Sequence, residues 1–172
     1  MKPKMIREVA GDILLSKAEL IGHGIATHDS FDSGLALTLR EAFPSLVRDY
    51  RHFIHNNPLK AGQIWVWTGV DGAGATRRVA NLITQDMQDD GKTARPDKAT
   101  LEHVVHALKA LAKYIKAEDV RSVALPCLAT GVGGLSWADV KPLIEAHLGD
   151  TGIPVLLYEV FHQGVKADEK LG

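Results

Sequence analysis

Two glycine-containing segments that precede helices have the composition of phosphate-binding loops. The first is Asp-Ser-Phe-Asp-Ser-Gly at residues 29–34, and the second is Ala-Thr-Gly-Val-Gly-Gly at residues 129–134. The first N–H groups of a helix have no partner within it, and the helix dipole is positive there. Glycine lets a ligand approach the backbone, so such a loop binds phosphate without a lysine. Either loop alone is explained as well by a simple turn, but two in one small domain predict a diphosphate held between two helix ends.

Two common nucleotide-binding motifs do not account for these loops. Residues 131–136, Gly-Val-Gly-Gly-Leu-Ser, lack the final glycine or alanine of the dinucleotide-binding fingerprint and come late in the chain. The P-loop pattern G-x-x-x-x-G-K-[ST] does not occur. The two loops therefore indicate a phosphate site of another kind.

Three other sets of side chains have both a functional and a structural interpretation. Asp12 follows the first strand, where it either accepts from an adenine amino group or sugar hydroxyl or caps a short helix at 13–17. Cys127 follows Pro126 in an apolar strand and has no basic neighbour, so we expect a buried structural thiol. Histidines at 52 and 55 and at 103 and 106 have metal-compatible spacing without matching carboxylates, so we expect surface histidines. We expect no metal and no cofactor.

The composition is that of a single globular domain. The 172 residues are 45% hydrophobic and 24% charged with a net charge of −1, which excludes wholesale disorder and argues against binding of bulk nucleic acid. No apolar run approaches the ~20 residues of a membrane span, no secretory signal is visible, and one cysteine allows no disulfide framework. We expect a cytoplasmic protein without a membrane partner. The domain covers residues 1–172, with a core over 5–161 and a polar tail, 162–172, that we expect to fray.

The elements that position the two loops alternate between strands and helices. Apolar and β-branched runs predict strands at 5–10, 19–26, 63–70, 79–84, 121–128 and 155–161. Helical spacing predicts helices at 35–43, 46–54, 99–117 and 136–148, and residues 85–98 read as a polar loop. The strands at 63–70 and 79–84 are expected to form an antiparallel pair. This order predicts an α/β fold, a three-layer α/β/α sandwich around a central mixed sheet.

Read in order, these segments resemble the macrodomain family, which binds ADP-ribose. The resemblance is carried by Gly-Asp-Ile at 11–13, Asp-Ser-Gly-Leu-Ala at 32–36 and Leu-Pro-Cys-Leu-Ala-Thr-Gly-Val-Gly-Gly-Leu-Ser-Trp at 125–137. It runs from about Met5 to Phe161. The chain is most similar to the subclass with a G-x-G-I-A-like first loop, which includes terminal ADP-ribose protein glycohydrolases, antitoxins that remove ADP-ribose from DNA, and yeast-type ADP-ribose-1″-phosphatases. It is less similar to the subclass with an N-A-A-N motif, because Gly-Ile-Ala-Thr stands there at 24–27.

The resemblance implies a role for each matching residue. Asp12 would accept from the adenine amino group with Ile13 beside it, and Phe161 would pack on the adenine. Ser33 to Ala36 would wrap the diphosphate and distal ribose, Thr130 to Leu135 would cradle the phosphates from the other side, and Phe31 would cover the distal ribose. Phe31 and Phe161 are equally candidates for the core. The implied ligand-binding residues are Asp12, Ile13, Phe31, Ser33, Gly34, Leu35, Ala36, Thr84, Gln85, Thr130, Gly131, Val132, Gly133, Gly134, Leu135 and Phe161.

Catalysis is where this chain departs from the family pattern. The related glycohydrolases use a lysine where this chain has Gln85 and an aspartate where it has Gly133, and neither replacement supplies a nucleophile or a base. The phosphatase-like members have a histidine at the end of the second strand, which His23 matches by spacing. His23 is therefore either the catalytic acid or base or a hydrogen-bonded core histidine. We expect a hydrolase acting on ADP-ribose derivatives; the alternative is a reader that binds ADP-ribose or an ADP-ribosylated substrate, including modified nucleic acid, without turnover.

Overall fold

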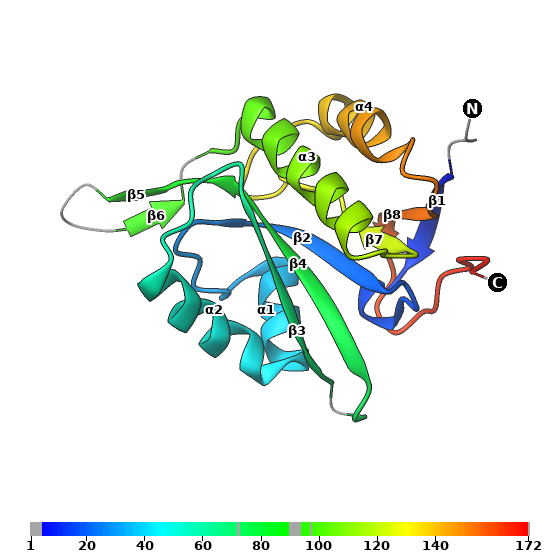
Figure 1. Ribbon diagram of the computed structural model, residues 1–172, viewed down its shortest axis with the longest axis horizontal. Helices are drawn as coiled ribbons and strands as arrows, with labels where there is room; N and C mark the ends of the chain where they lie inside the picture. The colour runs from blue at the N-terminus through cyan, green and yellow to red at the C-terminus, as the bar shows by residue number, and fades with distance from the viewer. Residues whose placement is uncertain (1–4, 72, 90–93, 97, 172) are drawn as a thin grey trace.

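The computed structural model describes residues 5–71, 73–89, 94–96 and 98–171. Its centre is a six-stranded sheet in the order β1-β8-β7-β2-β4-β3 (Figure 1). All neighbouring strands are parallel except β3, which runs antiparallel to β4 at one edge. The bounds are β1 Ile6–Gly11, β2 Leu20–Ala26, β3 Ile64–Val70, β4 Thr76–Gln85, β7 Val123–Leu125 and β8 Val155–Phe161. The mixed sheet and its antiparallel pair are those predicted from the sequence.

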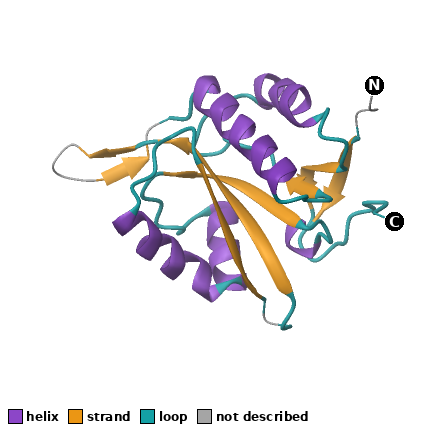
Figure 2. Ribbon diagram, viewed as in Figure 1, coloured by secondary structure: helices purple, strands orange, loops and turns teal. Residues whose placement is uncertain are grey.

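Helices cover both faces of this sheet and complete the predicted three-layer sandwich (Figure 2). Helices α3 and α4 pack on one face, and α1 and α2 pack on the other. Their bounds are α1 Gly34–Ala42, α2 Pro44–Asn56, α3 Leu101–Ala117 and α4 Trp137–Leu148. The apolar stripe predicted for α3 is confirmed, because Val104, Leu108 and Leu111 are fully buried against the sheet.

Alternation along the central strands decides which side chains face which helices. Successive residues of a strand point to opposite faces. On β2, Leu20 joins the core beneath α3 and α4, whereas Ile25 joins the core beneath α1 and α2. His23 has the parity of Ile25 and so lies on the α1 side. Its register partner on β4 is Asn81, on that same face.

Two predicted elements differ from the structure. The strand expected at 121–128 is only Val123–Leu125, since Pro126 has no N–H to continue the ladder. The expected strand position of Cys127 is therefore wrong, because Cys127 lies in the following loop. The polar segment expected to be a loop contains the antiparallel strands β5, Met87–Asp89, and β6, Ala94–Pro96.

The tail expected to fray instead packs against the domain. The buried carboxylate of Glu169 accepts hydrogen bonds from Ser16 Oγ at 2.5 Å, Lys17 N at 2.9 Å and Tyr158 Oη at 2.6 Å. Arg7 Nη1 donates to the carbonyl oxygens of Glu169 and Lys170, at 2.8 Å each. The polar sequence of the tail did not predict these contacts, because most of them are specific hydrogen bonds and not burial of apolar side chains. In the described part of the chain no helix is long and apolar enough to cross a membrane.

Candidate functional site

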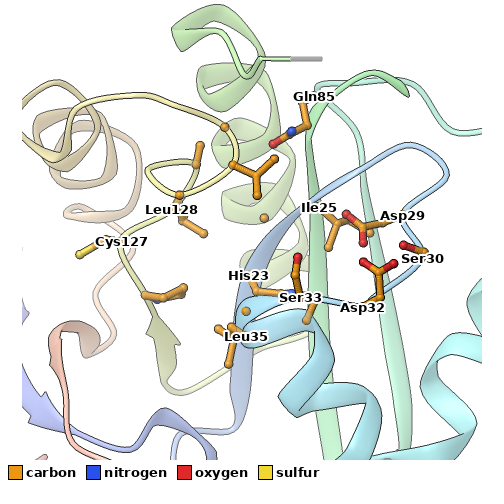
Figure 3. Close-up of a pocket in the computed structure, with 18 of the residues that line it drawn as sticks. His23, Ile25, Asp29, Ser30, Asp32, Ser33, Leu35, Gln85, Cys127 and Leu128 are labelled. Carbon is orange, nitrogen blue, oxygen red and sulfur yellow. The ribbon is translucent and has the colours of Figure 1, made fainter. Parts of the chain in front are cut away.

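A cavity of about 710 Å³ opens at the carboxyl ends of β2, β4 and β7 (Figure 3). Figure 3 shows Asp29, Ser30 and Asp32 along one side, Cys127 and Leu128 along the opposite side, and His23 and Ile25 between them. Open α/β sheets bind ligands at this edge, and the volume is typical of small-molecule sites. Among the described residues that line it there is no lysine or arginine.

The first wall is the loop from β2 to α1, which is folded around one aspartate. Asp29 Oδ2 accepts from Ala26 N at 3.0 Å and Oδ1 accepts from Phe31 N at 2.8 Å. Phe31, whose amide closes this Asx turn, lies in the left-handed region with φ 57°, an uncommon conformation for a bulky residue. The side chain of the N-cap residue Ser33 does not cap α1. The amides of Gly34, Leu35 and Ala36 consequently have no hydrogen-bond partner among the described residues.

The second wall is the loop from β7 to α4. It is closed by hydrogen bonds from Leu135 N to Ala129 O at 3.0 Å and from Gly134 N to Gly131 O at 3.1 Å. Ala129 is left-handed, with φ 60°, so this loop also concentrates strain beside the cavity. The amides at positions 131, 132 and 133 donate to none of the described residues. Two sets of unpartnered amides therefore border one cavity.

Gly133 is required by the packing of this loop. A Cβ atom built there would lie 2.6 Å from the Ala129 carbonyl oxygen and 3.0 Å from Ala99 Cβ. At Gly131 a Cβ would meet nothing within 4 Å. The loop conformation thus excludes any side chain at position 133, including the aspartate that the resemblance places there.

His23 lies at the base of the cavity with an exposed fraction of only 2%. Its Nε2 lies 2.6 Å from Asn81 Oδ1, and its ring meets that of Phe31 edge-on at a centroid distance of 5.8 Å. Burial lowers the pKa of His23, and the hydrogen bond to Asn81 and the negative charge of Asp29 oppose this shift. The imidazole is therefore neutral at pH 7 and able to accept a proton.

The structure brings about half of the predicted ligand-binding residues to the cavity. Gln85 from the end of β4 reaches it with its side chain almost fully buried. The complete set of predicted residues that line the cavity is His23, Ser33, Gly34, Leu35, Ala36, Gln85, Gly131, Val132 and Gly133. Both glycine loops thus border one cavity, as the hypothesis of a diphosphate held between two helix ends requires.

The remaining predicted residues lie around the cavity rather than on its surface. Phe31 is fully buried between His23 and Tyr50, so its expected place over a ribose is wrong and it belongs to the core. Thr84 is also fully buried, and its Oγ1 has no partner among the described residues. The side chain of Thr130 braces the second loop, because its Oγ1 donates to Cys127 O at 2.8 Å. Gly134 and Leu135 close that loop through the backbone bonds given above.

Asp12, Ile13 and Phe161 form a separate group beside the folded tail. Asp12 Oδ1 accepts from Leu14 N and Oδ2 accepts from Gly164 N, both at 3.0 Å, so its capping interpretation is confirmed. Ile13 is a core residue. Phe161 pairs with Gly11 at the end of β8 and is 60% exposed. These residues do not line the cavity, and the tail is hydrogen-bonded to the end of β1 beside them.

Sequence reasoning missed several residues that shape the site. Asp29 builds the first loop, and the Asp-x-Phe spacing of its Asx turn was an available signal. Asn81 could be paired with His23 only from the strand register. Cys127 is half-buried and lines the cavity. Burial and the nearby charge of Glu159 raise the pKa of its thiol, and the charge of Lys141 opposes this shift. The raised pKa disfavours a nucleophilic role for Cys127. In the described segments no three His, Cys, Asp or Glu side chains converge as metal ligands.

Comparisons with known proteins agree on one family. The Macro domain family model matches residues 23–144. A DNA ADP-ribosyl glycohydrolase of Thermus aquaticus is 31% identical over 156 residues, covering 90% of this chain and 41% of that protein. An ADP-ribose 1″-phosphate phosphatase of Candida albicans is 20% identical over 147 residues, covering 82% of this chain and 92% of that protein. The solved macrodomain of Thermus aquaticus DarG superposes with a TM-score of 0.75 at 30% identity, covering 90% of this chain and 98% of that one. The chain spans about two-fifths of the length of the first of these relatives.

Proposed function

The chain belongs to the Macro domain family, and from this premise we propose that its cavity binds the terminal ADP-ribose group of a modified substrate and hydrolyses the bond at the distal ribose. The observation that carries the proposal is the pair of unpartnered amide sets, at 34–36 and 131–133, on opposite walls of one cavity. Amides at helix ends and in glycine loops bind phosphate through fixed dipoles. A diphosphate between these walls would be bound without a cationic side chain from the described residues.

The adenine end of the ligand would lie toward Asp12 and Phe161. Each carboxylate oxygen has two lone pairs, so Asp12 Oδ2 could accept from an adenine amino group in addition to Gly164 N. The exposed ring of Phe161 offers an apolar face for a base to stack on. Ile13 would support Asp12 from the core. The tail residues around Gly164 would then form one wall of the adenine site.

The bond-breaking step would use His23 as a general base. Its neutral imidazole would take a proton from a water molecule as the water oxygen attacks the phosphorus or C1″ of the scissile bond. The bonding electrons would go to the leaving atom, which would take the same proton from the imidazolium. Water is consumed, and no oxidant or cofactor is needed. Loop amides would stabilise the charge that develops on the phosphate oxygens.

A lysine–aspartate mechanism is not available to this chain. Gln85 stands where related glycohydrolases have the lysine, and position 133 has no room for any side chain. Both facts support hydrolysis of an ester or phosphate of the distal ribose over cleavage through a lysine adduct. The Candida albicans relative is named for such a phosphate substrate. A lone, half-buried cysteine is consistent with action in the reducing cytoplasm.

The same two replacements support a second candidate, a reader that binds ADP-ribose without turnover. Turnover assays on ADP-ribose 1″-phosphate, an ADP-ribosyl carboxylate ester and ADP-ribosylated DNA distinguish the two. For a hydrolase we expect one of these substrates to be consumed and His23→Ala to lower kcat by about 10²–10⁴-fold while ADP-ribose affinity is retained. Unchanged turnover in His23→Ala would remove the catalytic role of His23, and binding without turnover of any substrate would support the reader.

A further inference from the structure

Behind the imidazole of His23, on the side away from the cavity, lies a buried amide that the proposed reaction does not use. We infer that Asn81 is a positioning residue, which holds His23 in the single tautomer whose bare Nδ1 faces the cavity. The inference rests on the proposed function of His23 as a base. Asn81 itself is fully buried and does not line the cavity, so it would act only through His23.

The orientation of the Asn81 amide is set by two backbone carbonyl groups. Its Nδ2 donates to Trp65 O at 3.0 Å and to Val79 O at 3.3 Å. Turning the amide over would place Oδ1 against two carbonyl oxygens and leave a buried NH₂ group facing the ring. The first change replaces two hydrogen bonds by repulsion between oxygen atoms and takes the side-chain donor away from both carbonyl groups. Oδ1 therefore faces His23, and it can only accept.

The acceptor at Asn81 decides where the imidazole proton lies. Nε2, at 2.6 Å from Oδ1, must carry a hydrogen atom. A neutral imidazole has only one such hydrogen, so Nδ1 is left with a lone pair. Nδ1 has no hydrogen-bond partner among the described residues, and it is not fully sealed from solvent. Because His23 lines the cavity, we place Nδ1 on the cavity side, where a base is needed.

The groups around His23 determine how its ring is packed and which charges lie near it. The ring of Phe31 packs edge-on against the imidazole, which is also held by its hydrogen bond to Asn81. Asp29, in the loop before α1, is the acidic group whose field reaches His23, and its carboxylate is held by two backbone amides. Asp32 lines the same cavity, and Tyr50 from α2 contacts Phe31. Burial and the field of Asp29 raise the pKa of Tyr50 above its ordinary value, so its hydroxyl stays neutral.

The first test reads the tautomer directly and needs no substrate. Long-range ¹H–¹⁵N spectra of protein labelled with ¹⁵N-histidine distinguish protonated from unprotonated ring nitrogens, and a His23→Gln sample assigns the signals. We expect His23 above neutral pH to show a protonated Nε2 and a bare Nδ1. A protonated Nδ1, or two tautomers in exchange, would overturn the inference.

The second test removes or charges the acceptor. Asn81→Leu should give mixed tautomers and lower kcat nearly as far as His23→Ala does, with little change in KM. Asn81→Asp should move the acid limb of the kcat profile upward by about 1–3 pH units, since a carboxylate stabilises the imidazolium. Ser122→Ala is the matched control, because it removes a partly buried hydrogen bond from Glu19 N just before the amino end of β7, away from the cavity. In Ser122→Ala, the tautomer of His23 and the value of kcat should remain those of the unmodified protein.

The outcomes separate this inference from the proposed function. If the unmodified protein turns over no substrate, the proposed hydrolysis fails, while the ¹⁵N spectra still decide the tautomer. If turnover is found but Asn81→Leu and Asn81→Asp keep the kcat and pH profile of the unmodified protein, Asn81 has no positioning role. Should Asn81→Leu not fold, Asn81→Asp and the spectrum of the unmodified protein remain decisive.

Discussion

At the scale of single residues, the site depends on backbone groups that a side chain would block. Gly131 and Gly133 are two positions apart in the same loop, yet they face different surroundings. The first borders open space, whereas the second is packed against Ala129 and Ala99. Binding through amides explains how a chain with a net charge of −1 could hold a diphosphate in a cavity whose described lining has no lysine or arginine.

Substitutions at these two glycines should separate binding from stability. Gly133→Ala should lower the free energy of unfolding by about 1–3 kcal/mol, because its Cβ overlaps the Ala129 carbonyl. Gly131→Glu should leave stability unchanged and abolish ADP-ribose binding, since a carboxylate would occupy the phosphate position. Urea denaturation and calorimetric titration measure the two effects. Normal binding by Gly131→Glu would show that the diphosphate lies elsewhere.

Burial of His23 also predicts a pH dependence of stability. Because its pKa is lowered in the folded state, the unfolded chain binds a proton more readily between the folded value and the ordinary value of about 6.5. The stabilisation is complete above that ordinary value and is lost as the pH falls through this interval. Urea denaturation should show that the free energy of unfolding falls between pH 7.5 and pH 5. In His23→Gln this fall should be smaller by the amount that His23 contributes. The exposed His52→Gln should retain the full loss; an equal loss in both variants would contradict the assignment.

At the scale of elements, the tail joins two parts of the domain that are far apart in sequence, the segment after β1 and the strand β8. Gly164 contacts Asp12 after β1, and Glu169 contacts Ser16 and Tyr158. Burial, followed by the hydrogen bond to Glu169, raises the pKa of Tyr158 above its ordinary range. The tail is therefore a structural part of the fold at the end of β1.

Removal of the Glu169 carboxylate should release the tail. Glu169→Ala leaves the hydroxyls of Ser16 and Tyr158 without their buried acceptor, which costs about 1–3 kcal/mol of unfolding free energy. Amide hydrogen exchange at Asp12, which donates to Val165 O at 2.7 Å, should become faster. Asp168→Ala, on the exposed neighbouring residue, is the control and should change neither quantity. Unchanged exchange in Glu169→Ala would mean that other contacts hold the tail.

The elements themselves were largely predictable from sequence, and the contacts between them were not. Hydrophobic periodicity located α3, β2 and β8, and glycine placement located both loops, because these signals are local. The pairing of His23 with Asn81 depends on strand register across 58 residues of sequence. The docking of Glu169 depends on hydrogen bonds to distant side chains, which no periodic pattern records. Phe31 was ambiguous because an aromatic ring fits a ribose and a core equally well.

At the scale of the whole molecule, the two ends of the central sheet carry hollows lined by different kinds of side chain. The carboxyl ends of β2, β4 and β7 carry the cavity, and no lysine or arginine lines it among the described residues. The amino ends of β1, β2, β7 and β8 border a second hollow that includes Arg7, Lys17, Arg121 and Lys170. Among the described residues, the second hollow is thus lined by several basic side chains and the cavity by none.

This separation predicts that ADP-ribose binding depends little on salt. Fixed dipoles in a partly enclosed cavity are screened less than exposed charges, and no counterions are released from a basic surface. Calorimetric titrations at several salt concentrations should give a nearly flat plot of log affinity against log salt. A slope of about −1 or steeper would indicate an ion contact with a lysine or arginine and would contradict a site built from amides.

The central claim is that the two glycine loops hold the diphosphate of ADP-ribose, and the structure of the complex tests it most directly. A crystal structure with ADP-ribose should show phosphate oxygens accepting from the amides at 34–36 on one side and at 131–133 on the other. The distal ribose should lie beside His23, and the adenine between Asp12 and Phe161. A diphosphate bound outside this cavity, or no binding at millimolar ADP-ribose, would contradict the account.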